Sequence, residues 1–371
     1  MKPRQTRSLF ALATVCLTAA IGTALGTRPA PVRALPTFAR QTGMTCNTCH
    51  SIAPKLNANG LAYQANYFNW PGGLPHPAGK GLDAVPISGL ITNTGGSSQN
   101  APTGTKFQAF ELFAAGGFRP YAGHGGGYWV DELTGENNGT RPGFLDGAWV
   151  AIPVAGATGQ LAMRIGQFSP VNYQWDGISS LTQTLPAALT SPINSIAMDS
   201  STPAVSLEYF SNRGRKTANG LYVDAGMPLG GHLTLNKDAR LYSAQGAYLH
   251  AFMRHGYDTR GVFAYRSGSA TQEGLILTRQ LTKQLTVLGI GAVGGDVGGN
   301  QQHLSAQADY VLSPALAFSA RYDYIRGVVH DQYPVVALTY YPLNQHALRL
   351  TGESVLDGGN RTNTVYVLVQ L

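Results

Sequence analysis

Most of the chain beyond residue 85 alternates apolar and polar residues with a period of two. In one segment His303 and Asp309 fall on one side of an extended strand, while Leu304 and Tyr310 fall on the other. Successive side chains of a strand point to opposite sides, so this alternation predicts strands with one polar and one apolar face. The same pattern recurs at about 159–168, 316–324 and 346–355.

These strands favour a membrane barrel. Strands of about ten residues, with an apolar outer face and aromatic residues near their ends, are typical of bacterial outer-membrane barrels. We therefore predict an all-β transmembrane barrel over residues 85–371. It should have about 14 to 16 antiparallel strands, with 16 preferred because single-chain bacterial barrels have even strand numbers. A soluble β-sandwich or propeller shows the same alternation and is the alternative.

The connections predict which end of the barrel faces the cell. Outer-membrane barrels have short periplasmic turns and longer extracellular loops. Tight turns are predicted at 281–283, 312–314 and 342–344, and longer loops at 266–273, 294–302, 325–332 and 356–362. The stretches 118–143 and 169–202 also resemble extracellular loops, but a strand count from Val85 puts them on the periplasmic side. One strand is therefore miscounted in this half.

The N-terminus predicts export. Three basic residues precede an apolar run over 9–25, and small residues and prolines follow up to Ala34. This is the pattern of a secretory signal peptide, here residues 1–34, cut after Ala34. A retained membrane anchor is the alternative, because the run is long enough to span a bilayer.

Charge excludes one class of partner. The whole chain has 26 basic and 19 acidic residues, but five of the basic residues lie in the predicted signal peptide. The mature chain then has 21 basic against 19 acidic residues. A nucleic-acid binder would need a clustered basic face, so we expect no nucleic-acid partner.

The cysteines carry the clearest chemical signal. Cys16 lies in the predicted signal peptide, which leaves Cys46 and Cys49 in the mature chain, followed directly by His50. In a CxxCH motif the two thiols attach to the haem vinyl groups and the histidine reaches the iron. We predict one covalent haem c, with Cys46 and Cys49 as thioether ligands and His50 as the proximal axial ligand.

Two other uses of a CxxC pair are weaker. A structural zinc site needs four ligands, and the sequence has no second Cys/His cluster downstream. A redox disulfide usually opens a helix in a βαβ pattern, whereas β-type sequence follows this motif after a short helical stretch. Both remain alternatives to haem.

Residues 35–84 are predicted to form a small helical and loop segment, here called the plug. About fifty residues are too few to enclose a haem and form an independent core, so the plug must lean on the barrel. His76 is the candidate sixth iron ligand, an open site is the alternative, and Met163 should point outward from the barrel. Four aromatic residues after the motif either stack on the haem or pack against the barrel, namely Tyr63, Tyr67, Phe68 and Trp70.

The start of the plug resembles a known family. The lead PTFARQTG at residues 36–43, the CNTCH motif, Pro54-Lys55-Leu56 and Gly60 are similar to the start of the fused monohaem cytochrome-porins, bacterial outer-membrane Fe(II) oxidases. Beyond about Tyr67 the likeness is one of architecture. Where members commonly read Phe-Gly and Phe-Lys, this chain has Asn59-Gly60 and Tyr63-Gln64.

The resemblance implies a function and partners. Extracellular Fe(II) would be oxidised at the haem, and the electron would pass to a periplasmic c-type cytochrome, with the barrel in outer-membrane lipid. By its place in the matching segment, Arg40 is a candidate contact for a haem propionate, and a solvated loop arginine is the alternative.

Other functions remain open. They are a diffusion porin with a haem-bearing plug, a haem-barrel conduit for another donor or for outward flow, and a periplasmic cytochrome fused to a β-sandwich. Acidic residues predicted on polar strand faces are candidate attractants for Fe(II) in the lumen, although such residues are usual there. They are Glu111, Glu208, Asp309, Asp323 and Glu353.

Overall fold

The computed structural model describes most of the plug and barrel. The described residues are 37–52, 54–70, 87–98, 101–121, 124–134, 144–154, 160–171, 181–182, 184–193, 197–229, 246–296, 299–327, 330–343, 348–357 and 360–370. The predicted signal peptide and His76 lie outside them. None of the described helices is long and apolar enough to cross a membrane.

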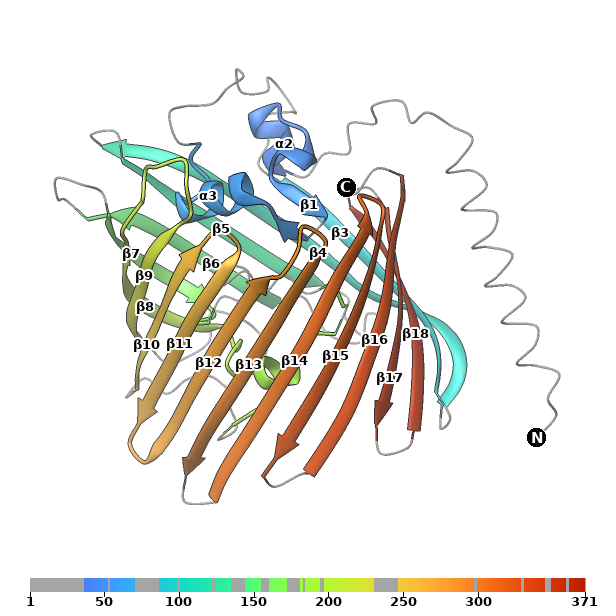
Figure 1. Cartoon of the computed structure of the whole chain (residues 1–371). Helices are drawn as coiled ribbons and strands as arrows, with labels where there is room; N and C mark the ends of the chain where they lie inside the picture. The colour runs from blue at the N-terminus through green and yellow to red at the C-terminus, as the bar shows by residue number, and fades with distance from the viewer. Residues whose placement is uncertain are drawn as a thin grey trace, which may run out of the picture.

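Sixteen antiparallel strands of the described residues, β3 to β18, close into a barrel (Figure 1). The last strand closes on the first, with Val367 opposite Asn93. The predicted fold class and the preferred strand number are therefore confirmed. The strands are β3 (Ile87–Ser98), β4 (Ala101–Tyr121), β5 (His124–Thr134), β6 (Phe144–Pro153), β7 (Leu161–Phe168), β8 (Thr202–Phe210), β9 (Gly220–Pro228), β10 (Ala247–His255), β11 (Asp258–Ser267), β12 (Ala270–Gln280), β13 (Leu285–Asp296), β14 (Gly299–Ser313), β15 (Leu316–Arg326), β16 (His330–Leu343), β17 (Leu348–Asp357) and β18 (Asn360–Gln370).

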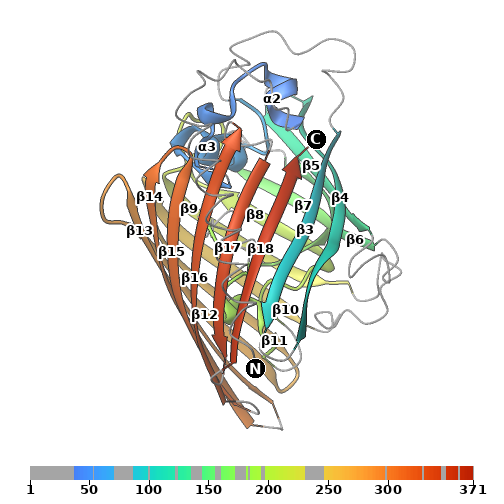
Figure 2. The ribbon, with the colours of Figure 1, turned by 90° about the vertical axis from the view of Figure 1, so that its right-hand side faces the viewer.

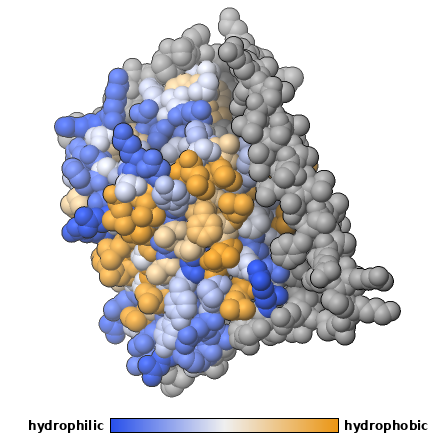
Figure 3. Space-filling view, turned by 45° about the vertical axis from the view of Figure 1, so that its right-hand side comes forward, coloured by the Kyte–Doolittle hydropathy of each residue, from blue (hydrophilic) through white to orange (hydrophobic). Residues whose placement is uncertain are grey.

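The alternation places polar side chains inside the barrel and apolar ones outside. On β7, Met163 is 37% exposed whereas the neighbouring Arg164 is 1% exposed, so Met163 points outward as predicted. Exposed leucines, valines and aromatic residues recur on nearly all strands from β7 to β18. On the face that Figure 3 shows, apolar side chains gather across the middle of the barrel, with hydrophilic surface above and below them. Such a band matches the hydrocarbon layer of a bilayer.

The predicted long loops of the C-terminal half are wrong. Strand β11 ends at Ser267 and β12 begins at Ala270, and the other predicted long loops are likewise mostly strand. Their Gly, Asn, Gln and Ser residues pair across the hairpins, as Asp296 does with Gly299 and Asp357 with Asn360. These polar segments are therefore the ends of strands, because polar side chains do not prevent the backbone from pairing.

The miscounted strand lies in the stretch 118–143. Strand β4 runs to Tyr121 and β5 occupies His124–Thr134, so this stretch contains a hairpin. With that correction, the strand ends that flank the longest gaps, 169–201 and 229–246, lie opposite the C-terminus. The predicted tight turns lie at the same end as the C-terminus.

The plug lies at the C-terminal end of the barrel in both views (Figures 1 and 2). It consists of α2 (Thr37–Thr42), the 3-10 turn η1 (Cys46–Thr48), the strand pair β1 (His50–Ile52) and β2 (Lys55–Leu56), and α3 (Ala58–Ala65). Asn57 caps α3, because its side-chain oxygen accepts from the backbone N–H groups of Asn59 and Gly60. The boundary predicted between residues 84 and 85 lies outside the described residues.

Plug and barrel share one apolar core. Leu61, Tyr67 and Phe68 of the plug belong to the same buried cluster as Trp149 on β6 and Phe252 on β10. The cluster continues into Leu189 of α5 (Ala187–Thr190), which lies inside the barrel. The expectation that so short a plug must lean on the barrel is met by this packing.

Candidate functional site

The CxxCH motif forms one compact turn. The N–H of Thr48 donates to the Thr45 carbonyl at 3.0 Å, and that of Cys49 donates to the Cys46 carbonyl at 3.1 Å. His50 follows directly as the first residue of β1. The turn thus brings Cys46, Cys49 and His50 together.

Both thiols are half-buried, and neither is in a disulfide. Burial raises the pKa of Cys46 to about 11 and that of Cys49 to about 11. Redox-active cysteines in CxxC motifs have a lowered thiol pKa, because the thiolate is the reactive species. The environment of this pair is therefore unlike that of a thiol-disulfide catalyst.

His50 is held as a neutral imidazole. Burial lowers its pKa to about 4, while the backbone groups of Pro54 and Lys55 act in the opposite direction. The neutral ring is the form that binds a metal, and a backbone partner on the other ring nitrogen orients such a ligand. This arrangement suits a haem ligand.

Helix α3 packs closely behind the cysteine turn. The Asn57 N–H donates to the Cys49 carbonyl at 2.8 Å. A Cβ atom at Gly60 would lie 2.1 Å from the same carbonyl oxygen, so this position requires glycine. Among the described residues, no three His, Cys, Asp or Glu side chains are grouped to hold a metal ion.

Aromatic rings surround this part of the plug. The Phe38 ring stacks on Phe68 at 4.7 Å between centroids and meets Tyr63 edge-on at 5.4 Å. The Tyr63 ring also lies 5.8 Å from that of Trp70. Of the two predicted roles, packing is the one observed, and the cluster also borders the cysteine turn.

Glycines on β4 and β5 let the plug backbone lie against the barrel wall. A Cβ at Gly117 would lie 2.6 Å from the Phe68 carbonyl oxygen, and one at Gly127 would lie 2.6 Å from that of Tyr67. Asn69 donates to the Gly126 carbonyl at 2.8 Å. Because any side chain here would displace the plug, these glycines form its docking surface.

A buried polar cluster fastens the plug to β7, β8 and β9. The Tyr67 hydroxyl donates to Glu208, whose other oxygen accepts from the Tyr222 hydroxyl at 2.9 Å. Arg164 bridges Glu208 at 2.9 Å and Asp224 at 2.7 Å. Removing any one partner would leave a buried group unsatisfied, so the cluster specifies the docked position.

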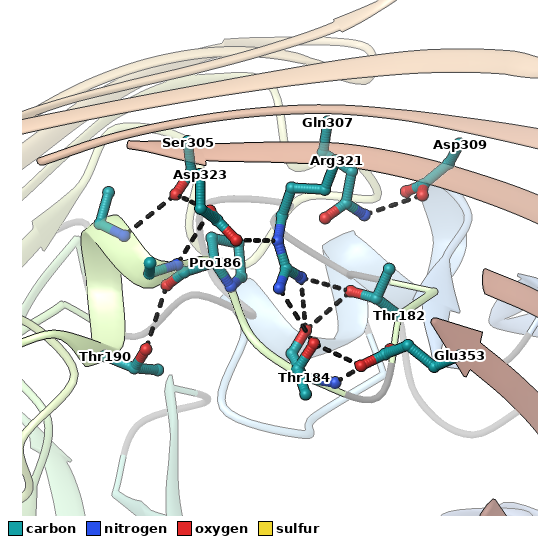
Figure 4. Close-up of polar contacts among 12 residues, drawn as sticks. Thr182, Thr184, Pro186, Thr190, Ser305, Gln307, Asp309, Arg321, Asp323 and Glu353 are labelled. Carbon is teal, nitrogen blue, oxygen red and sulfur yellow. Dashed lines mark hydrogen bonds and ion pairs between the residues drawn. The ribbon is translucent and has the colours of Figure 1, made fainter. Parts of the chain in front are cut away.

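A second buried network ties residues 181–182 and 184–193, here called the lumenal segment, to the opposite wall (Figure 4). Arg321 donates to the Thr182 hydroxyl at 2.7 Å and pairs with Asp323 at 2.7 Å. The Thr184 hydroxyl donates to Glu353 at 2.6 Å. The lumenal segment is therefore a fixed part of the barrel interior.

The acidic residues proposed to attract Fe(II) are mostly engaged. Glu208, Asp323 and Glu353 take part in the two networks just described. Asp309 is buried and accepts from Gln307 and Ser319, while Glu111 is half-buried on β4. The first four therefore act as structural hydrogen-bond partners.

The structure places some predicted site residues and leaves others open. Cys46, Cys49 and His50 come together in one turn, as described above. The Arg40 side chain and His76 lie outside the described part of the chain, so both stay predictions. Sequence reasoning missed the wall glycines and the partners of Tyr67. The run of glycines at 125–127 is the available signal, although its composition favours a loop.

Comparison with known proteins shows the fold. No family model matches the chain, and no curated protein matches it. Similar solved structures are OmpF of Salmonella typhi in complex with daunomycin (11% identity, TM-score 0.59, 77% of this chain and 97% of that one) and OmpT of Vibrio cholerae (8%, 0.56, 77% and 99%). The outer membrane channel DcaP of Acinetobacter baumannii is a third (10%, 0.53, 77% and 96%). The chain thus has the fold of the outer-membrane porins.

Proposed function

We propose that this protein is an outer-membrane electron-transfer protein, a porin-like barrel whose plug carries one haem c. In this proposal extracellular Fe(II) is the electron donor and substrate, and a periplasmic c-type cytochrome is the acceptor. The signal peptide at residues 1–34 directs export. The strand ends that flank the longest gaps lie opposite the plug, so the plug end is assigned to the periplasm.

The observation that carries the proposal is a CxxCH turn on a plug that is docked inside a barrel. Haem c, when bound, supplies a one-electron redox couple at its iron. Cys46 and Cys49 would hold it covalently, and His50 would ligate the iron through its neutral imidazole. The aromatic rings of Phe38, Tyr63 and the neighbouring cluster would exclude water from this part of the plug, which is one way a protein raises a haem potential.

Reconstitution in liposomes tests electron transfer across the membrane. Vesicles are loaded with an oxidised soluble c-type cytochrome, the full-length protein is inserted, and Fe(II) is added outside without oxygen. We expect the trapped cytochrome to become reduced. The Cys46→Ala/Cys49→Ala double variant is the matched control, and equal rates for the two proteins would overturn the proposal.

A diffusion channel with a haem-bearing plug is the second candidate. It is favoured by the porin fold and by the lumenal segment folded into the barrel. Liposome swelling in small sugars tests it: a channel gives swelling that survives the loss of both cysteines. No swelling with either protein would leave electron transfer as the function of the barrel.

A further inference from the structure

Arg213 is a buried cation that has no hydrogen-bond partner among the described residues. It lies between β8 and β9 at the plug end of the barrel, and its side chain is only 9% exposed. Its Nε, Nη1 and Nη2 atoms are all buried, and none has an acceptor in the described ranges of the chain. A guanidinium has five N–H donors and stays charged in proteins, so its burial without acceptors is strongly unfavourable.

Glu208 and Asp224 do not supply the missing acceptor. Glu208 accepts from Tyr67 and Tyr222 and pairs with Arg164 at 2.9 Å, and Asp224 accepts from Arg164 at 2.7 Å. Within the part of the chain that the structure describes, the donors of the Arg213 guanidinium therefore remain unused.

The position of Arg213 is fixed against the plug. Its guanidinium carbon lies 4.0 Å from the centre of the Tyr67 ring. The next residue, Gly214, donates its N–H to the side chain of Asn66, which donates back to the Arg215 carbonyl at 3.0 Å. The unused donors are therefore held at the junction of plug and wall.

This junction lies near the haem motif. Asn66, which contacts Gly214 and Arg215, also donates to the Ala62 carbonyl of α3 at 2.7 Å. Gly60 of the same helix packs against the Cys49 carbonyl. In haem the propionates lie on the porphyrin edge away from the vinyl groups that cysteines bind. The carboxylates of a haem attached at the cysteine turn would thus lie away from the two cysteines.

We propose that Arg213 binds a carboxylate at the junction of plug and wall. A guanidinium pairs with a carboxylate through two parallel hydrogen bonds, and this would satisfy donors that are now buried. The inference rests on the proposed function where the carboxylate is a haem propionate. A free carboxylate solute offers the same chemistry and is the other source.

The first arm of the test uses the full-length haem protein. Arg213→Gln, Arg213→Lys and the control Arg215→Gln, an exposed neighbour, are compared with the wild type at equal haem content. A nearby cation favours the reduced haem, so Arg213→Gln should lower the midpoint potential. We expect about a tenfold change in the ratio of reduced to oxidised haem, which is 59 mV for one electron. Arg213→Lys should restore part of it, and Arg215→Gln should have little effect.

The second arm uses the full-length Cys46→Ala/Cys49→Ala protein, which cannot hold haem covalently. Succinate is titrated while tryptophan fluorescence is followed, because the Trp149 ring lies 6.3 Å from that of Tyr67. A response lost in Arg213→Gln, with no shift of potential in the first arm, would identify a free carboxylate. No effect in either arm would overturn the inference. If the wild-type protein carries no haem, the proposed function is refuted. The succinate titration alone would then show whether Arg213 binds a carboxylate.

Discussion

Gly127 is the position where docking of the plug is most easily disturbed. A methyl group there would lie 2.6 Å from the Tyr67 carbonyl oxygen and 2.7 Å from its Cβ, well inside van der Waals contact. Both neighbours belong to a buried, hydrogen-bonded residue and have little room to move. Overpacking of this kind costs about 1–3 kcal/mol. Gly127→Ala should therefore shift the balance from docked to undocked plug by about 5- to 150-fold.

Limited proteolysis measures this shift. Cleavage within the plug requires undocking, so its rate should rise in proportion to the undocked fraction when docking is fast relative to cleavage. Gly289→Ala is the matched control, because a Cβ at Gly289 would meet nothing within 4 Å. Equal cleavage rates for Gly127→Ala and Gly289→Ala would refute the idea that wall glycines hold the plug.

Three further substitutions test other parts of the account. Tyr67→Phe leaves buried Glu208 one donor short and should weaken docking by about 1–3 kcal/mol, measured by the same proteolysis. Arg321→Gln leaves Asp323 buried without its cation and should weaken the attachment of the lumenal segment to the wall by about 3–5 kcal/mol. We expect protease cleavage within the lumenal segment and higher conductance in planar bilayers. Unchanged conductance would count against a role of this segment in narrowing the lumen. Met163→Arg puts a charge on the lipid-facing side and should lower the free energy of unfolding, measured by urea titration, by up to about 2–4 kcal/mol. No change in that free energy would contradict the lipid-facing assignment.

The barrel was predictable from sequence because its information is local. Alternation put Arg164 inside and Met163 outside, and the structure agrees at both positions. Strand ends were harder to predict, since residues such as Gly299 and Asn360 have loop-like composition but pair across hairpins. Residue composition indicates whether a segment is exposed to solvent, but it does not indicate whether the backbone of that segment pairs with a neighbouring strand.

The docking of the plug could not be predicted, because it depends on residues far apart in the chain. Tyr67 meets Glu208, which is 141 positions away, and Gln41 donates to the Ala115 carbonyl 74 positions away. Nothing in either local sequence specifies the partner. The cysteine turn is different, since Cys46, Cys49 and His50 are neighbours in sequence and must come together in any fold.

The most direct test of the central claim is an absorbance spectrum of the full-length protein, extracted from outer membranes of a host that attaches haem c. The spectrum is recorded oxidised, after anaerobic Fe(II), and after dithionite. The account predicts haem bands that Fe(II) converts to the reduced form and that are absent in the Cys46→Ala/Cys49→Ala protein. A protein without haem bands would contradict the claim that the plug is a cytochrome. Bands that only dithionite reduces would keep the haem but exclude Fe(II) as the donor.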